Sequence, residues 1–249
     1  PPVCLSYGEK VLQSDKGDTI VPIALGTYGN LSVITAPPKT KKTFFVSLLA
    51  SAYLSGKNIY SGQIKGHRGN GDLIHFDTEQ GNWHASKVFK RPLDMDTSIK
   101  EDKYHTFALR TVGFKERLEF IEYYLKEKIK EPSLVIIDGV ADLCGDVNNI
   151  EQSNNLVSAL MRISTQCNVH IICVIHQNYG SQKLGTGHLG SALEKKAETV
   201  ISLEANTVNK DWITVKCGRS RGYSFETFSF EVNKKGLPTI VGDLYDPLK

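Results

Sequence analysis

The residues best suited to chemistry lie in one segment, 33–45, which reads Val-Ile-Thr-Ala-Pro-Pro-Lys-Thr-Lys-Lys-Thr-Phe-Phe. An apolar run, a tight loop and a Lys-Thr pair that opens a second apolar run follow one another, which is the layout of a phosphate-binding P-loop, G-x-x-x-x-G-K-[ST]. In such a loop, backbone N–H groups at a helix N-terminus cradle phosphate oxygens, a lysine neutralises them and a hydroxyl group holds Mg²⁺. Lys42 and Thr43 fit the last two roles.

The glycines of this motif are replaced, because Ala36 stands at the first position and Lys41 at the second. A non-glycine residue at a positive φ costs on the order of 1–3 kcal/mol, which a folded domain can absorb. The rest of the loop differs little from the form T-G-P-P-G-T-G-K-T, and its additional lysines bring positive charge near the phosphates. The predicted nucleotide-binding residues are Ala36, Pro37, Pro38, Lys39, Thr40, Lys41, Lys42 and Thr43. A degenerate loop that no longer binds nucleotide is the alternative.

Two carboxylates stand at the ends of apolar runs. Asp138 closes the run 134–137, and at the carboxyl end of a central strand beside a P-loop it would hold Mg²⁺ through water, together with Thr43. Glu79 follows the run 73–77, where a carboxylate near the γ-phosphate can polarise an attacking water. The alternatives are an aspartate that begins a turn and an exposed loop glutamate.

A His-Gln pair follows the apolar run 169–175. Gln177 could detect the γ-phosphate through a hydrogen bond, and the alternative is an ordinary surface amide. His176 is more often a packed or capping histidine than a catalytic one, so no role is predicted for it.

The elements that must position these residues alternate between strand and helix. Strands are expected at 31–35, 73–77, 104–110, 134–138, 169–175, 200–203, 212–216 and 225–232. Helices are expected at 44–55, 114–130, 153–166 and 191–198, and one could begin near 81. Segments 63–72 and 91–103 are expected to be loops, the second because it is polar and contains Pro92. This order predicts an α/β fold with a mainly parallel sheet, helices on both faces and a C-terminal β-hairpin edge.

Size and composition indicate one large domain of 249 residues, with a lead-in at 1–28, a core at 29–232 and a tail at 233–249. No run of about 18 apolar residues predicts a membrane span. Five cysteines without a C-x-x-C pair argue against zinc or a disulfide framework and favour the cytoplasm. A net charge of +3 is too small to indicate nucleic-acid binding by itself. The opening Pro-Pro favours a fragment of a longer chain.

The order of these motifs resembles the RecA-type ATPase core. The P-loop is followed by segments 76–80, 136–139 and 175–177 at the ends of successive strands, and segment 187–200 is similar to the region after the glutamine in one branch. That branch is the RepA/DnaB-like hexameric helicases, the RepA-like AAA family ATPases of mobile genetic elements. The resemblance covers about residues 29–232, and it departs from the family at the P-loop glycines.

The resemblance implies ATP and Mg²⁺ as ligands and gives each site residue a role. Lys42 and Thr43 would contact phosphate and metal, Asp138 would be the metal-holding acid, and Glu79 the catalytic base. Gln177 would link the γ-phosphate to a loop that faces DNA.

The resemblance also implies partners. A homo-oligomeric ring, such as a hexamer, would let Arg219 or Arg221 reach a neighbour's site as an arginine finger, with a solvated basic hairpin as the alternative. Loops 142–152 and 178–189 would face the ring's channel, where Lys183 and His188 are candidates for contact with single-stranded DNA. The first of these loops is acidic, and the more basic segment 63–70 is better explained as a surface loop.

Three functions are therefore open. The favoured one is an ATP-hydrolysing motor domain that acts on DNA in replication or mobilisation of a genetic element. The second is a degenerate P-loop domain that serves as a non-hydrolysing assembly or DNA-tethering module. The third is a KaiC-like regulatory ATPase that acts on proteins.

Overall fold

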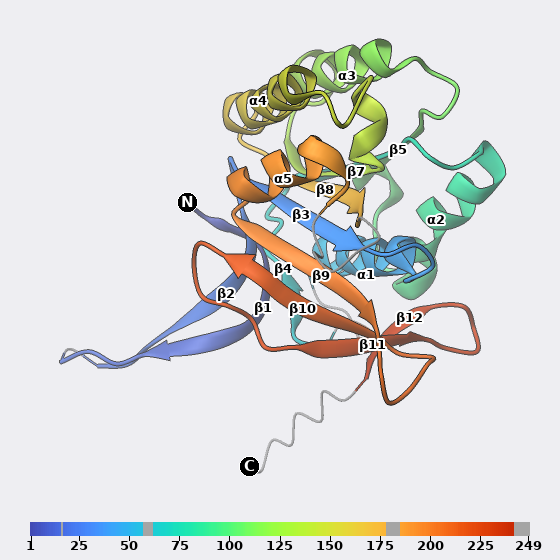
Figure 1. Cartoon of the computed structure of the whole chain (residues 1–249). Coiled ribbons are helices and arrows are strands. Elements are labelled where there is room, and N and C mark those ends of the chain that lie inside the picture. Colours follow the sequence, from blue (N-terminus) through green and yellow to red (C-terminus); the bar gives the residue numbers. More distant parts are fainter. Residues whose placement is uncertain (16, 57–61, 178–184, 242–249) are drawn as a thin grey trace.

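The computed structural model describes the chain except residues 16, 57–61, 178–184 and 242–249 (Figure 1). Within the described residues, the main sheet has nine strands in the order β12-β11-β10-β9-β3-β8-β7-β5-β6. Six of them are parallel: β3 (Leu31–Ala36), β5 (Asp72–Asp77), β6 (Tyr104–Ala108), β7 (Pro132–Asp138), β8 (His170–His176) and β9 (Thr199–Ala205). An antiparallel edge follows, made of β10 (Ile213–Ser220), β11 (Phe228–Val232) and β12 (Pro238–Val241). The predicted fold class is confirmed.

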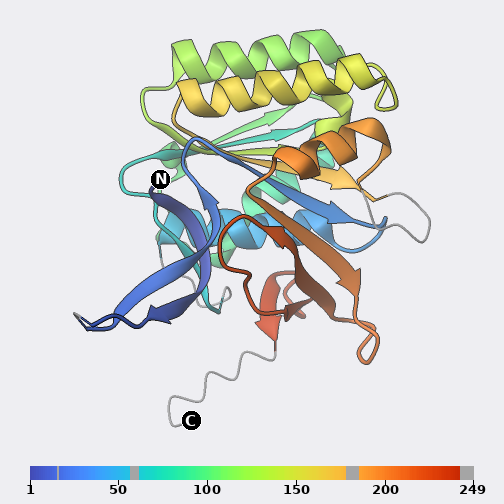
Figure 2. The same ribbon diagram turned by 60° about the vertical axis from the view of Figure 1, so that its left-hand side comes forward.

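Helices cover both faces of this sheet (Figure 1, Figure 2). One face packs against α1 (Lys42–Ser55) and α2 (Asn82–Met95). The other packs against α3 (Phe114–Tyr123), the π-helical turn Tyr124–Lys128, α4 (Ile150–Gln166) and α5 (Gly187–Lys196). Ile34 of β3 belongs to the first core and Val33 to the second. A strand buried on both faces reads as the continuous apolar run seen in the sequence.

The first 28 residues contribute two strands to a second sheet. Strand β1 (Val3–Leu12) pairs with β2 (Thr19–Thr27) and with the short β4 (Ile64–Gly66). The expectation of a loop throughout 63–72 was therefore wrong. A Cβ on Gly66 would lie 2.4 Å from Cα of Tyr53, so this short strand packs directly on the α1 backbone.

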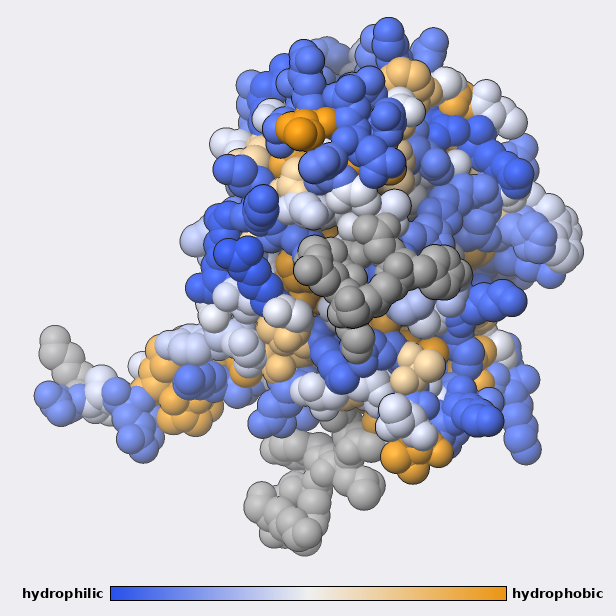
Figure 3. Space-filling model, viewed as in Figure 1, coloured by the Kyte–Doolittle hydropathy of each residue, from blue (hydrophilic) through white to orange (hydrophobic). Residues whose placement is uncertain are grey.

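The β1–β2 hairpin projects from the body of the molecule (Figure 2). Val11 and Ile20 are paired across its two strands, and their side chains are 53% and 63% exposed. Figure 3 shows apolar surface on this projecting arm. The far end of the hairpin is thus the part of the second sheet that the core does not cover.

Segment 91–103 is not an exposed loop, which corrects a second expectation. Helix α2 continues through Pro92 to Met95, and both side chains are buried. Ile99 is buried beyond the helix end, and a 3₁₀ turn at Glu101–Lys103 leads into β6. Burial of these side chains against α1 outweighs the hydrogen bond that Pro92 cannot donate.

The remaining differences are small. Helix α5 begins at Gly187 rather than at Ser191, and β12 adds a strand within the segment expected to be a tail. Within the described residues, no helix is long and apolar enough to span a bilayer.

Candidate functional site

The candidate site begins with the loop between β3 and α1. Thr40 Oγ1 donates a hydrogen bond of 2.6 Å to the carbonyl of Pro37, which closes the turn. Lys41 has φ 56° at the N-cap of α1, and its carbonyl accepts the N–H groups of Phe44 and Phe45. The loop therefore turns sharply and starts a helix at Lys42, as a P-loop requires.

Only one of the two positions at which the motif has glycine shows a positive φ. Ala36, at the first, is the last residue of β3 and lies in its ladder beside His176. Lys41, at the second, is left-handed, and so is Lys39 with φ 65°, for which no strain was expected. Each non-glycine residue in this region of the backbone map costs about 1–2 kcal/mol.

Lys41→Gly is expected to raise the free energy of unfolding by about 1 kcal/mol, because glycine adopts a positive φ without strain. Urea unfolding measures the change. Lys41→Asn, which tolerates the left-handed region, should give a smaller gain in the same direction. A loss of stability in the glycine variant would show that the hydrogen bond from Lys41 Nζ to the Asp211 carbonyl, 2.9 Å, outweighs the strain.

Two aspartates face each other at the carboxyl ends of neighbouring strands. β5 and β7 are in register, so Asp77 lies opposite Asp138, and both are buried. Burial, with the nearby Asp77 and Glu79 carboxylates, raises the pKa of Asp138 to about 8. Burial also raises the pKa of Asp77, although its Oδ1 accepts the N–H groups of Glu79 (3.0 Å) and Gln80 (2.8 Å). In the described structure, Oδ2 of each aspartate is buried without a hydrogen-bond partner.

This pair fits a magnesium ion. A hard cation prefers oxygen ligands, and the two aspartates offer buried carboxylate oxygens that have no hydrogen-bond partner in the described structure. Thr43, in the first turn of α1, carries a hydroxyl group that could be a further ligand. Among the residues that the structure describes, no three His, Cys, Asp or Glu side chains gather to hold a metal. Mg²⁺ suits such a sparse set because it keeps several waters and binds phosphate oxygens alongside one or two carboxylates.

Lys42, His176 and Glu79 form a chain of contacts across the mouth of the site. The Lys42 ammonium lies 2.9 Å from Nδ1 and 3.5 Å from Nε2 of His176, and Nε2 lies 3.4 Å from Oε1 of Glu79. The contact with His176 is the main cause that lowers the pKa of Glu79, so this carboxylate is ionised at neutral pH. Burial lowers the pKa of Lys42, and the charges of Glu79 and Asp138 oppose that shift.

Gln177 is buried rather than a surface amide. Its Nε2 donates to Oγ1 of Thr35 at 3.1 Å, and its backbone N–H donates to the carbonyl of Ala36. The side chain thus joins the end of β8 to the strand that leads into the loop.

Arg219 and Arg221 lie away from this site. Arg219 pairs with Val200 near the start of β9, and Thr199, the first residue of β9, pairs with Ser32 near the start of β3. Both arginines are exposed, and Arg221 donates to the carbonyl of Lys196 at 2.9 Å. They therefore stand at the amino ends of the parallel strands, whereas Lys42 follows the carboxyl end of β3.

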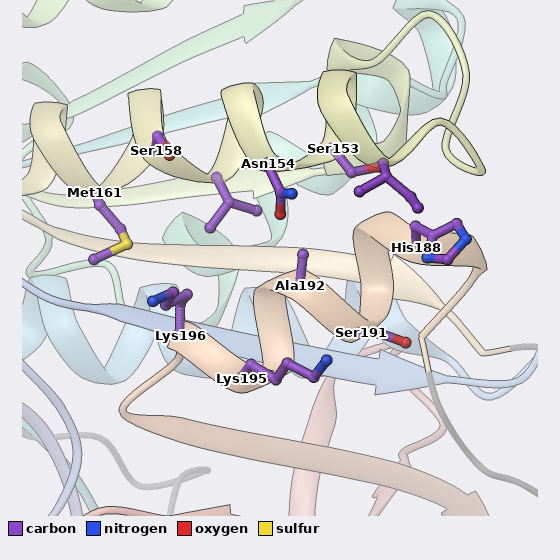
Figure 4. Close-up of a pocket in the computed structure, with 11 residues that line it drawn as sticks. Ser153, Asn154, Ser158, Met161, His188, Ser191, Ala192, Lys195 and Lys196 are labelled. Carbon is purple, nitrogen blue, oxygen red and sulfur yellow. The ribbon is translucent and has the colours of Figure 1, made fainter.

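Of the two candidate DNA contacts, the structure describes only His188, which lies outside the loop site. His188 is exposed near the start of α5, at a pocket of about 420 Å³ between α4 and α5 (Figure 4). Lys195 and Lys196 line the same pocket, with Val157 and Met161 on the α4 side. Lys183 lies outside the described residues.

The structure brings together Lys42, Glu79 and Asp138, which were predicted from the sequence. It adds Asp77 and His176, which were not predicted. Asp77 had a signal, because it ends an apolar strand just as Asp138 does. His176 had none, because both of its partners are distant in the chain.

Comparisons with known proteins agree with this architecture. The sequence matches the family described as an AAA domain over residues 25–182. No curated protein matches it. The fold is similar to the crystal structure of the RadB recombinase, with a TM-score of 0.57 and 15% identity over 85% of this chain and 90% of that chain. It is also similar to a second solved structure, an ATPase domain, with a TM-score of 0.56 and 15% identity over 84% of this chain and 83% of that chain. At this identity the two structures show the fold alone, a RecA-like P-loop core, as expected.

Proposed function

Since the chain belongs to the AAA domain family, we propose that it binds ATP with Mg²⁺ at the loop 36–43, hydrolyses it, and uses the reaction to act on DNA. The observation that carries the proposal is the convergence of one lysine and two carboxylates at a helix N-terminus. Lys42, Glu79 and Asp138 come from three segments of the chain and interact electrostatically in one half-buried to buried cluster.

Hydrolysis would proceed by in-line attack of water on the γ-phosphorus. The water oxygen forms the new P–O bond, Glu79 accepts a proton, and the bond from the γ-phosphorus to the bridging oxygen breaks to release ADP and phosphate. Lys42 would stabilise the charge on the phosphoryl oxygens. Mg²⁺, held by Asp138 and Thr43 with water, would neutralise the phosphates when bound.

DNA is proposed as the partner on two grounds. The motif order resembles the RepA/DnaB-like helicase branch, and one similar structure is that of a recombinase. A role in replication or mobilisation of a genetic element, and location in the cytoplasm, belong to this proposal. Arg219 and Arg221 lie at the amino ends of the parallel strands, whereas the loop follows their carboxyl ends. These arginines could therefore enter only the site of a neighbouring copy. For this reason we propose a ring, such as a hexamer.

Steady-state ATP hydrolysis, with and without single-stranded DNA, tests the proposal. Lys42→Ala should abolish turnover, and Lys90→Ala, which removes an exposed lysine from α2, should leave it unchanged. Turnover that requires Lys42 and rises with DNA is the expected result. Turnover that does not change when DNA is added would favour a regulatory ATPase. Absence of both ATP binding and ATP turnover would establish a degenerate loop.

A further inference from the structure

We propose that His176 is a positioning residue for hydrolysis. Its imidazole aims the Glu79 carboxylate and occupies the Lys42 ammonium until a nucleotide phosphate takes its place. This role rests on the proposed function and adds to it a residue that the motif resemblance leaves without a task.

The imidazole of His176 contacts a cation and an anion. Lys42 Nζ lies 2.9 Å from Nδ1 and 3.5 Å from Nε2, so the ammonium is within reach of both ring nitrogens. Nε2 also lies 3.4 Å from Oε1 of Glu79. The ring therefore touches both groups that the proposed reaction needs.

The backbone of His176 is held in place on both sides. His176 is the last residue of β8 and pairs with Ala36 in the parallel ladder. Its carbonyl accepts hydrogen bonds from the N–H and the hydroxyl of Thr186, at 2.9 and 2.8 Å, at the N-cap of α5. The side chain itself is 40% exposed, so it is not a core residue whose main task is packing.

Glu79 depends on this contact for its orientation. In the described structure its backbone is held by Asp77, but no hydrogen bond from a group other than His176 reaches its carboxylate. A general base acts only when it is aimed at the proton that it accepts, and a misplacement of about 1 Å can cost roughly 10²-fold in rate.

The first experiment compares the kinetics of His176→Leu and His176→Gln. Leucine removes both polar atoms, whereas the glutamine amide offers an acceptor for Lys42 and a donor for Glu79. We expect kcat of His176→Leu to fall roughly tenfold to hundredfold with KM for ATP changed less than about threefold. His176→Gln should recover most of the loss. Equal kcat in wild type and His176→Leu, or equal losses in both variants, would overturn the role.

The second measurement does not depend on turnover. Ring ¹⁵N chemical shifts of the histidines, of which the chain has seven, report the surroundings of each ring, and the resonance absent from His176→Gln identifies His176. We expect the ring resonances of His176 to shift in Lys42→Ala and on addition of a non-hydrolysable ATP analogue. Resonances that neither change affects would contradict the proposal.

The two measurements separate this role from the proposed function. A wild-type protein without turnover would remove the proposed function and the catalytic part of the role together. Wild-type turnover with unaffected His176→Leu kinetics would remove the role alone. Thermal unfolding of both variants shows whether either fails to fold, and His176→Gln carries the test if leucine is not tolerated.

Discussion

Glu79→Gln is expected to lower kcat for ATP hydrolysis by about 10²–10⁴-fold while ATP still binds. The amide keeps the size of the carboxylate but cannot accept a proton from water. Lys42 and the loop remain in place, so the groups proposed to hold the phosphates are unchanged. The pKa of Glu79 lies below its ordinary value, so the wild-type base is ionised throughout the neutral range.

Single-turnover hydrolysis and calorimetric titration with ATP and Mg²⁺ separate the two effects. Glu119→Gln is the matched control, since this exposed residue of α3 lies outside the site. Turnover in Glu79→Gln equal to that of the control would exclude Glu79 as the base. A comparable loss of ATP binding would mean that the carboxylate organises the site rather than the proton transfer.

Asp138→Asn is expected to stabilise the nucleotide-free protein at pH 8 by a few kcal/mol, on the scale of about 1.4 kcal/mol per pKa unit, and to abolish turnover. Burial raises the pKa of Asp138 from 3.8 to about 8. Below about pH 4 the carboxyl is neutral in the folded and the unfolded chain. As the pH rises toward 8, only the unfolded chain gains from ionisation, so the wild type loses stability that asparagine retains.

Urea unfolding in the presence of EDTA at pH 5 and pH 8 measures this difference. The gain of Asp138→Asn over wild type should be larger at pH 8 than at pH 5. Asp94→Asn, at an exposed position of α2, is the control and should show no such dependence. Mg²⁺ with ATP should then stabilise the wild type more than the variant. A variant less stable than wild type at pH 8 would show that the second oxygen of Asp138 has a favourable partner in solution.

The central strands and the residues at their ends follow from local sequence. The runs 31–35, 73–77, 134–138 and 169–175 are apolar on both faces, and this pattern identifies buried parallel strands wherever they pair. Since parallel strands end at one edge of the sheet, the residues that follow them had to gather there. Lys42, Glu79 and Asp138 could therefore be predicted together without knowledge of the strand order.

Other features depend on pairing between distant segments, which the sequence does not reveal. Strand β4 is three residues long and exists because β1 lies beside it, and α2 passes Pro92 because α1 covers that side. The register of β5 against β7 places Asp77 opposite Asp138, and the fold brings His176 between Lys42 and Glu79. No periodicity in the chain encodes these contacts. These contacts are stabilised by the burial of side chains and by the attraction between charged groups, and the residues involved are far apart in the sequence.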